Sequence, residues 1–239
     1  MDQNLRVAVT GGTSGLGLAL VREWRRRGAR VAFVARTPRS VEDVAQEHQA
    51  HGIVGDVARQ EDIHPIALQI TAALGGLDVL VNNASSLGPT PLALLADTEC
   101  EDLELALATN VLGPFRLTKA LLGALSASAR EGHGSVVLNV SSDAAVSPYP
   151  QWGAYGASKA ALHHMSRIWN DELASEGIRV LSLDPGDMDT PLHAVAVPDA
   201  DPATLKRPDT AARELADAIA TALSASFLAA QTTAVEVTH

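Results

Sequence analysis

The sequence predicts an α/β fold in which one doubly wound parallel sheet carries helices on both faces. Short runs rich in β-branched residues recur along the chain and are apolar almost throughout, which is typical of strands covered on both faces. Segments with helical periodicity separate these runs. Strands that alternate with helices indicate right-handed βαβ units and therefore a parallel sheet.

The predicted strands and helices follow one another from the N-terminus to the C-terminus. We expect strands at 5–10, 30–35, 77–83, 135–140 and 179–184, a weak strand within 51–57 and a further strand at 233–237. We expect helices at 15–27, 41–50, 59–74, 98–130, 154–176 and 209–224. No repeat or low-complexity tract divides the chain, so residues 1–239 are predicted to form a single domain. The Pro- and Asp-rich segment 184–209 is interpreted as a functional loop, with 186–207 facing the substrate.

Composition and charge exclude several classes of protein. The 239 residues carry 18 Lys and Arg against 28 Asp and Glu, a formal charge of −10, which disfavours nucleic-acid and anionic-membrane partners. The lone Cys100 allows no intrachain disulfide, and no ligand spacing predicts a metal site. No apolar run is long enough to span a membrane, and the N-terminus lacks the pattern of a signal peptide. We therefore expect a cytoplasmic protein.

The first predicted strand runs into a glycine-rich loop that opens the first helix. The loop reads Thr10-Gly11-Gly12-Thr13-Ser14-Gly15-Leu16-Gly17. Gly11 permits a tight exit from the strand, Gly15 a close approach to a pyrophosphate, and Gly17 close packing of the helix on the sheet. The helix N-terminus directs free N–H groups at an anion. A turn that binds nothing is the alternative, but the strand before and the helix after favour a dinucleotide site.

The end of the second predicted strand indicates which dinucleotide this site prefers. NAD-binding sites usually place an acidic residue here to accept a hydrogen bond from the ribose, whereas this chain has Ala35 followed by Arg36. A guanidinium binds phosphate bidentately, so the sequence predicts NADP(H), unless Arg36 is only a surface arginine. Asp56 and Val57 follow the weak strand and are predicted to lie beside the adenine, although Asp56 could equally cap a helix.

Two further groups of polar residues predict catalysis. Tyr155 and Lys159 share one face of the helix 154–176, and an ammonium near a phenol stabilises the phenolate. The pair predicts a lowered tyrosine pKa and proton transfer near neutral pH. Ser141 and Ser142 follow a strand and reach the usual ligand crevice. Asn110 is either a satisfied buried polar group or part of a proton relay.

These motifs occur in the order of the short-chain dehydrogenase/reductase family, which the chain resembles over about residues 5–225. They are Thr10-Gly11-x-x-x-Gly15-x-Gly17, Asn82-Asn83-Ala84, Asn110, a serine on the fifth strand, Tyr155-x-x-x-Lys159 and Pro185-Gly186. The resemblance implies a Rossmann-type fold. It also selects Ser142 over Ser141, because the family's catalytic serine precedes the tyrosine by about thirteen residues.

The resemblance implies a catalytic tetrad. Ser142 would polarise a carbonyl, Tyr155 would protonate the alkoxide, Lys159 would lower the tyrosine pKa and hold the nicotinamide ribose, and Asn110 would fix a relay water. The nicotinamide supplies the hydride. The cofactor contacts that the resemblance implies beyond the glycine loop are Asp56, Val57, Asn82, Ala84, Tyr155, Lys159, Pro185, Gly186, Met188 and Thr190, with Thr190 holding the carboxamide.

The chain departs from the family pattern at three places. Ser85 stands where the family commonly has Gly, and Asp184 where Asn or Ser is common. The usual C-terminal Val-Asp-Gly-Gly is replaced by Ala-Val-Glu-Val. These departures argue against the common oxoacyl-carrier-protein reductase and simple alcohol dehydrogenase types.

Three of the eight aromatic residues, Tyr149, Trp152 and Tyr155, fall within seven positions. The segment 148–155 resembles that of the sepiapterin reductase and benzil reductase branch, which reduces vicinal dicarbonyls on flat substrates. This resemblance implies that Tyr149 and Trp152 form a stacking wall beside Ser142, with Glu236 as a substrate anchor. The alternatives are core packing for the aromatic residues and a solvated position for Glu236.

The sequence therefore predicts an NADPH-dependent reductase of a ketone, most simply a vicinal dicarbonyl on a flat or aromatic substrate. One alternative is a short-chain reductase or alcohol dehydrogenase with an unrelated substrate, and another is a non-catalytic NADP(H)-binding sensor or scaffold. In the family, the helices corresponding to 98–130 and 154–176 form the subunit interface, so a homodimer or homotetramer is expected.

Overall fold

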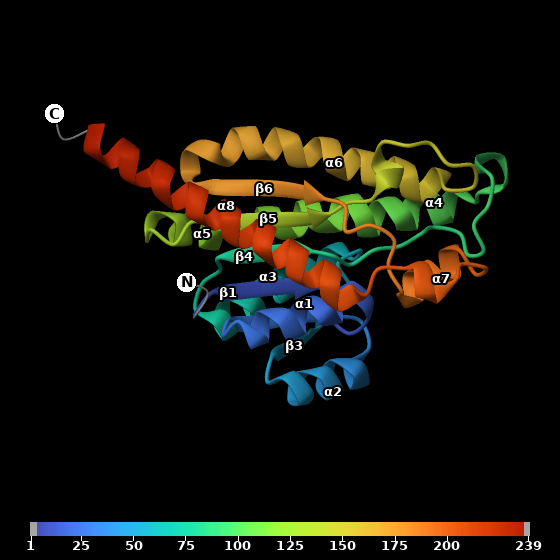
Figure 1. Ribbon diagram of the computed structural model, residues 1–239, viewed down its shortest axis with the longest axis horizontal. Coiled ribbons are helices and arrows are strands. Elements are labelled where there is room, and N and C mark those ends of the chain that lie inside the picture. Colours follow the sequence, from blue (N-terminus) through green and yellow to red (C-terminus); the bar gives the residue numbers. More distant parts are fainter. Residues whose placement is uncertain (1–3, 237–239) are drawn as a thin grey trace.

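A parallel sheet lies at the centre of the computed structural model, which describes residues 4–236, with side chains described up to Ala225 (Figure 1). Its strands are β1 (Arg6–Thr10), β2 (Arg30–Ala35), β3 (His51–Val54), β4 (Val79–Asn82), β5 (Ser135–Val140) and β6 (Ile178–Leu183). All neighbouring strands pair in parallel, in the order β3-β2-β1-β4-β5-β6. This architecture confirms the predicted fold class.

Helices connect the strands and cover both faces of the sheet. They are α1 (Gly15–Arg26), α2 (Pro38–His48), α3 (Gln60–Leu74), α4 (Cys100–Leu107), α5 (Gly113–Arg130), α6 (Gly153–Leu173), α7 (Pro191–Ala196) and α8 (Pro208–Glu236). Local chemistry sets several helix ends: Pro38 begins α2, where its missing N–H is not needed, and Gly75 ends α3 in the left-handed conformation.

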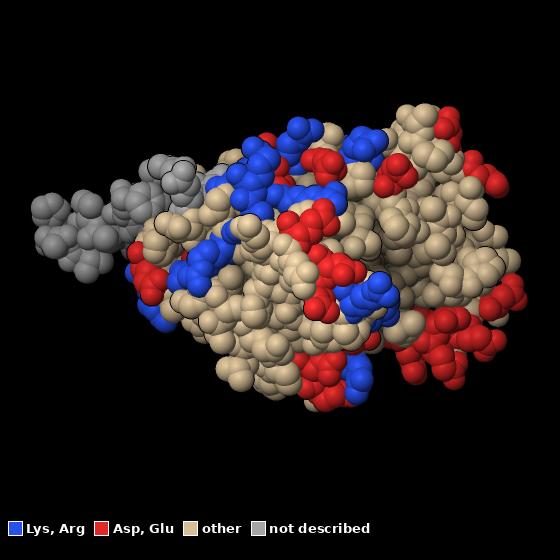
Figure 2. All heavy atoms as spheres, turned by 90° about the horizontal axis from the view of Figure 1, so that it is seen from below, with Lys and Arg blue, Asp and Glu red and all other residues tan. Residues whose placement is uncertain are grey.

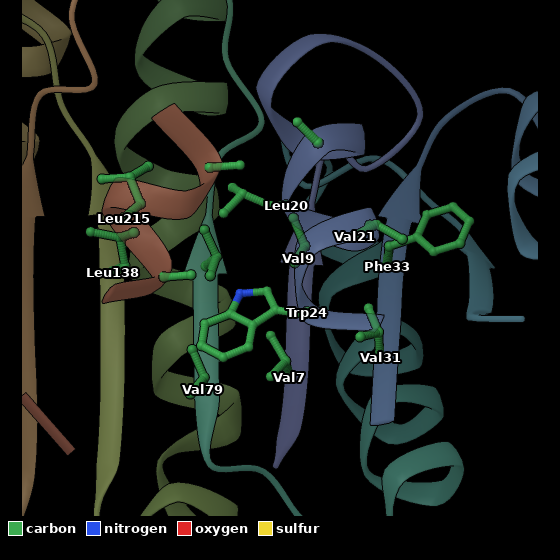
Figure 3. Packing of buried hydrophobic residues seen from close by; sticks show 14 of the residues in the cluster. Val7, Val9, Leu20, Val21, Trp24, Val31, Phe33, Val79, Leu138 and Leu215 are labelled. Atoms are coloured by element: carbon green, nitrogen blue, oxygen red, sulfur yellow. The ribbon is translucent and has the colours of Figure 1, made fainter. Parts of the chain in front are cut away.

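The two faces of the sheet have separate apolar cores. Side chains of α1, α2 and α8 pack on one face, and side chains of α3, α5 and α6 pack on the other. On the first face, the fully buried Trp24 of α1 lies against Val7 and Val79, with Leu20 of the same helix above it (Figure 3). These clusters fix the helices on the sheet, and thereby the loops at its carboxyl edge.

The segment 98–130 differs from the single long helix that its periodicity predicts. It divides into α4, a π-helical turn at Ala108–Leu112 and α5. A π-turn adds one residue to a helical turn, and such turns are frequent at functional sites. Here the widened turn carries the buried Asn110, which periodicity alone cannot reveal.

The predicted strand at 233–237 is wrong for its described part. Residues 233–236 continue α8, which runs from Pro208 to Glu236, past the end of the sheet (Figure 1). Residue 237 lies outside the described residues. A short apolar run cannot be assigned to strand or helix by periodicity alone, and this run is helical. No helix within residues 4–236 combines the length and apolar character needed to cross a membrane.

An ion pair at the amino edge of the sheet ties β1 to β4. Arg6 Nη2 lies 2.6 Å from Asp78 Oδ1, and the Asp78 side chain is only 3% exposed. Burial raises the pKa of Asp78, but the hydrogen bonds from Arg6 and Ser128 outweigh burial and hold the pKa below its ordinary value. Losing one partner would leave a buried charge uncompensated.

We expect Arg6→Met to lower the free energy of unfolding by about 3 kcal/mol, because Asp78 would stay buried without its partner. Urea unfolding at pH 7 measures the change. The control is Arg30→Met, since the exposed side chain of Arg30 donates to the carbonyl of Ala73 and its loss should cost less than about 1 kcal/mol. An equal decrease in the free energy of unfolding in the two variants would contradict the stabilising role of the Arg6–Asp78 ion pair.

Candidate functional site

The strand order reverses between β1 and β4, and the glycine loop leaves the sheet at this point. Thr10 Oγ1 accepts hydrogen bonds from the backbone N–H groups of Asn83 and Ala84, both at 3.0 Å. The side-chain Nδ2 of Asn83 donates to the carbonyl of Thr10 at 2.9 Å. These bonds fix the start of the loop against the segment after β4, where ligands bind in open parallel sheets.

The glycine loop forms a cradle with no room for side chains at its key positions. Gly11 and Gly15 have φ angles of 71° and 50°, which favour glycine. A Cβ on Gly17 would collide with the carbonyl oxygen of Gly11. Thr13 and Ser14 complete the turn, and Leu16 is buried in the first turn of α1. The cradle therefore fits the pyrophosphate that the sequence predicts there.

A cavity of about 340 Å³ lies beyond the ends of β2 and β3. Its lining includes Arg36, which is predicted to bind a ribose phosphate, together with Asp56 and Arg59. Asp56 Oδ1 accepts from the N–H of Ala58 and does not cap α3, whose N-cap is Arg59. Val57 is buried in the apolar core and is not among the residues that line this cavity.

Tyr155 and Lys159 lie on one face of α6, as predicted. Both are buried, with exposures of 7% and 3%, and Lys159 Nζ lies 5.5 Å from the centre of the tyrosine ring. The ammonium donates to the carbonyl of Val140 at 2.7 Å. Ser142 also reaches the tyrosine, and its hydrogen bond favours the phenolate. Three members of the predicted tetrad therefore meet at the carboxyl edge of the sheet.

Ionisation in this group differs from the sequence prediction. Burial raises the pKa of Tyr155 to about 12, although hydrogen bonds from Ser142 and Ser85 oppose the shift. Burial also lowers the pKa of Lys159 to about 8. The sequence prediction that Lys159 lowers the tyrosine pKa rested on the proximity of the two side chains. In the structure, desolvation has the larger effect on the pKa of both groups, and the tyrosine pKa is raised.

Asn110 is held by four hydrogen bonds through its side chain. Oδ1 accepts from Ser85 Oγ at 3.2 Å and from Ser86 N at 2.8 Å. Nδ2 donates to Ser86 O at 2.7 Å and to Ser158 Oγ at 2.8 Å. The side chain therefore fastens the segment after β4 to α6, and only the backbone of Asn110 is left for a relay.

Asn82 and Ala84 lie on either side of the contact with the glycine loop. Asn82 Nδ2 donates to Asn139 Oδ1 at 2.8 Å and to Thr118 Oγ1 at 3.2 Å, inside the buried region between strands. Its side chain supports the sheet and does not enter the crevice. Ala84 is partly exposed beside Gly11, which suits the predicted position along the cofactor.

The segment 186–207 contains α7 and is fastened at its base. Asp184 Oδ1 accepts from the N–H of Gly186, so the unusual aspartate stabilises the Pro185-Gly186 turn. Lys206 N donates to Asp187 O, and Asp189 N donates to Lys206 O, which pairs Met188 with Lys206 in an isolated bridge. Lys206 Nζ donates to the carbonyl of Pro185 at 2.9 Å and to Glu214 at 2.8 Å.

Thr190 brings this loop to the glycine cradle. Its side chain lies beside Gly15, where a Cβ would come within 3.2 Å of Thr190 Cγ2. Its hydroxyl accepts from the N–H of His193 at 3.2 Å and so caps α7. Residues distant in sequence therefore border one crevice, and the role of Thr190 toward the carboxamide stays a prediction.

The three aromatic residues form one continuous row. The ring centres of Tyr149 and Trp152 are 6.5 Å apart, and those of Trp152 and Tyr155 are 5.6 Å apart, both with edge-on geometry. The row ends at Tyr155, so a substrate at the tetrad would meet it. The side chain of Glu236 lies outside the described residues.

Several residues at the site carry roles that sequence reasoning did not assign. Thr10 and Asn83 clamp the glycine loop, Ser85 links Asn110 to the region of Tyr155, and Lys206 fastens the loop. The position of Asn83 next to Asn82 was a usable signal, whereas the contacts of Lys206 depend on tertiary structure. Within the described residues, no group of three or more His, Cys, Asp or Glu is arranged around a potential metal position.

Comparisons with known proteins identify the relatives of this chain. A family model described as short chain dehydrogenase matches residues 6–201. The chain is 32% identical over 194 residues to 2-(R)-hydroxypropyl-CoM dehydrogenase of Xanthobacter autotrophicus, covering 78% of this chain and 76% of that protein.

Solved structures show the same similarity. A 3-ketoacyl-(acyl-carrier-protein) reductase from Brucella melitensis, complexed with NADH, has a TM-score of 0.83 and 26% identity, covering 90% of this chain and 91% of its own. A short chain dehydrogenase from Burkholderia cenocepacia, in complex with NADP, has a TM-score of 0.81 and 26% identity, covering 91% of each chain.

We expect Lys159→Met to stabilise the cofactor-free protein at pH 7, by about 2–3 kcal/mol. The buried lysine has a folded-state pKa of about 8, below the unfolded value of about 10.4. The unfolded wild type therefore binds more protons between these pH values, and its free energy of unfolding should rise there with pH. In urea unfolding from pH 7 to 10, the free energies of unfolding of the wild type and Lys159→Met should converge. Parallel pH profiles would contradict a lowered pKa of Lys159.

Proposed function

The chain belongs to the short-chain dehydrogenase family, and we propose that it is an NADPH-dependent reductase of a ketone. The observation that carries this proposal is the meeting of Ser142, Tyr155 and Lys159 beside a glycine cradle. The family comprises oxidoreductases, and the retained catalytic side chains favour an active enzyme over a binding protein.

The residues present fit a dinucleotide. The pyrophosphate would lie at the cradle of Gly11, Gly15 and Gly17, where side chains are excluded. Arg36 at the cavity beyond β2 would bind the 2′-phosphate that distinguishes NADP from NAD. Since one similar structure holds NADH and another NADP, family membership alone leaves the preference open, and Arg36 supports NADPH.

Each catalytic side chain has a task that its surroundings support. The bound nicotinamide would supply the hydride. Ser142 would donate a hydrogen bond to the carbonyl oxygen, and Tyr155 would give that oxygen its proton. The raised pKa of Tyr155 keeps the phenol protonated and ready to donate. Lys159, with a pKa of about 8, would carry its charge at neutral pH and stabilise the phenolate as it forms.

The aromatic row supports a flat substrate. Tyr149 and Trp152 continue from Tyr155, so a ring next to the reacting carbonyl would find apolar surface there. We infer a vicinal dicarbonyl on an aromatic or flat molecule as the substrate class. The alternatives are a ketone or alcohol of unrelated structure and a non-catalytic NADP(H) sensor, which the first assay separates.

A homo-oligomer is also proposed. Phe115 of α5 and Trp169 of α6 stack with ring centres 5.3 Å apart, next to exposed Leu112 and Ile168. This apolar surface on two long helices suits a symmetric contact with a second copy.

We expect Arg36→Ala to reduce the preference for NADPH over NADH by about ten- to a hundredfold, because a charge-assisted contact to the 2′-phosphate is lost. The ratio of kcat/KM for the two cofactors measures the change. Exposed Arg130 at the end of α5 is the control, and Arg130→Ala should leave the ratio unchanged. A wild type that prefers NADH would refute the assignment of Arg36.

We expect rapid NADPH oxidation with benzil, 1-phenyl-1,2-propanedione or sepiapterin, slower turnover of acetophenone, and a loss of at least about a hundredfold in Tyr155→Phe because the proton donor is removed. Calorimetric NADPH binding to the variant is the control for folding. Faster turnover of acetophenone than of the dicarbonyls would refute the substrate class. Tight NADPH binding with no turnover of any ketone would favour the unrelated substrate or the sensor.

A further inference from the structure

Asp143 directly follows Ser142 and occupies the short 3-10 turn Asp143–Ala145 between β5 and α6. Its Oδ1 accepts a hydrogen bond from Ser142 Oγ at 3.0 Å. Its Oδ2 accepts a hydrogen bond from Tyr149 Oη at 2.6 Å. Both oxygens are therefore fixed beside the hydroxyl that is proposed to bind the carbonyl, although the reaction proposed above gives Asp143 no task.

The carboxylate carries its negative charge at neutral pH. The hydrogen bond from Tyr149 holds the pKa of Asp143 below its ordinary value. Within the described part of the chain, no Lys, Arg or His forms an ion pair with Asp143. The charge is also close enough to Tyr155 to act on its phenol. The site thus presents an anion that the protein itself does not neutralise.

Aromatic surface adjoins this anion. Tyr149, which holds Asp143, makes an edge contact with Trp152, and Tyr149 is 45% exposed. Ring faces attract organic cations, and aromatic side chains recur in sites for quaternary ammonium groups. Figure 2 shows the underside of the molecule in Figure 1, away from α6, and there the right-hand end beyond the strand tips carries scattered Asp and Glu side chains and no Lys or Arg.

We propose that Asp143 and Tyr149 select carbonyl substrates that carry a cationic nitrogen close to the reacting carbonyl. This inference rests on the reductase function proposed above and narrows its substrate class. A carbonyl oxygen bound by Ser142 at about 2.7 Å lies within about 6 Å of Asp143 Oδ1. The cationic nitrogen must therefore be two or three bonds from the carbonyl carbon.

The same geometry couples recognition to catalysis. The Ser142 hydroxyl has a single proton, and Asp143 and the Tyr155 oxygen compete to accept it. A cation paired with Asp143 competes for the carboxylate and leaves the serine proton for the carbonyl oxygen. A neutral ketone provides no such competition.

A pair of isosteric ketones tests this selectivity. Phenacyltrimethylammonium and 3,3-dimethyl-1-phenylbutan-1-one differ only in the exchange of a charged nitrogen for a carbon. The ratio of their kcat/KM values with NADPH should fall about five- to tenfold in Asp143→Asn, because an exposed charge contact is lost. Tyr149→Leu should also lower the ratio. Asp199→Asn, which changes the net charge equally at an exposed position, should not.

A binding measurement separates this proposal from the reductase function. Phenyltrimethylammonium titrated into the NADPH-loaded protein in a calorimeter should bind more weakly to Asp143→Asn than to wild type. That result supports the cation site even if no ketone is reduced. Equal binding to both proteins, an unchanged ratio in Asp143→Asn, or an equal fall in Asp199→Asn would overturn the proposal.

Discussion

The hydrogen bonds of Thr10 with Asn83 and Ala84 join the two halves of the sheet where the strand order reverses. They place the end of β1 and the end of β4 at a fixed separation. The glycine loop starts from one of these ends, and the segment that Asn110 fastens starts from the other. The cradle and the catalytic edge therefore share one rigid support, although they come from different parts of the chain.

Buried polar groups beneath the site extend this support at a cost in stability. Asn82, Asn139 and Ser166 form a hydrogen-bonded row between β4, β5 and α6. Lys159 Nζ donates to the backbone carbonyl of Val140 and lies over the Tyr155 ring, and desolvation lowers its pKa. Hydrogen-bonded networks of this kind fix a unique arrangement of the side chains. The buried Lys159 ammonium, in contrast, lowers the stability of the folded protein because it is desolvated, and an apolar residue in its place would remove this cost. Functional sites commonly retain residues that lower the stability of the fold.

The fold and the positions of the main site residues could be predicted from the sequence, because continuous apolar runs and fixed motif spacings depend on local order. The pKa values of Tyr155 and Lys159 could not, since desolvation depends on how completely other elements cover them. Periodicity did not predict the π-turn around Asn110 or the helical conformation of residues 233–236, because both depend on the surrounding structure. Asp143 was missed although it follows Ser142, because its significance lies in a contact with Tyr149 that only the folded turn creates.

The contacts of Lys206 divide the loop into a fastened base and a segment that extends from it. The backbone of Lys206 forms hydrogen bonds with the residues on both sides of Met188. Its side chain donates hydrogen bonds to the carbonyl of Pro185 and to Glu214. Residues 190–205, which carry α7, therefore leave and return at the same hydrogen-bonded base. The turn at Pro185 and Gly186 is thereby held independently of α7, because its side-chain hydrogen bonds come from Asp184 and Lys206.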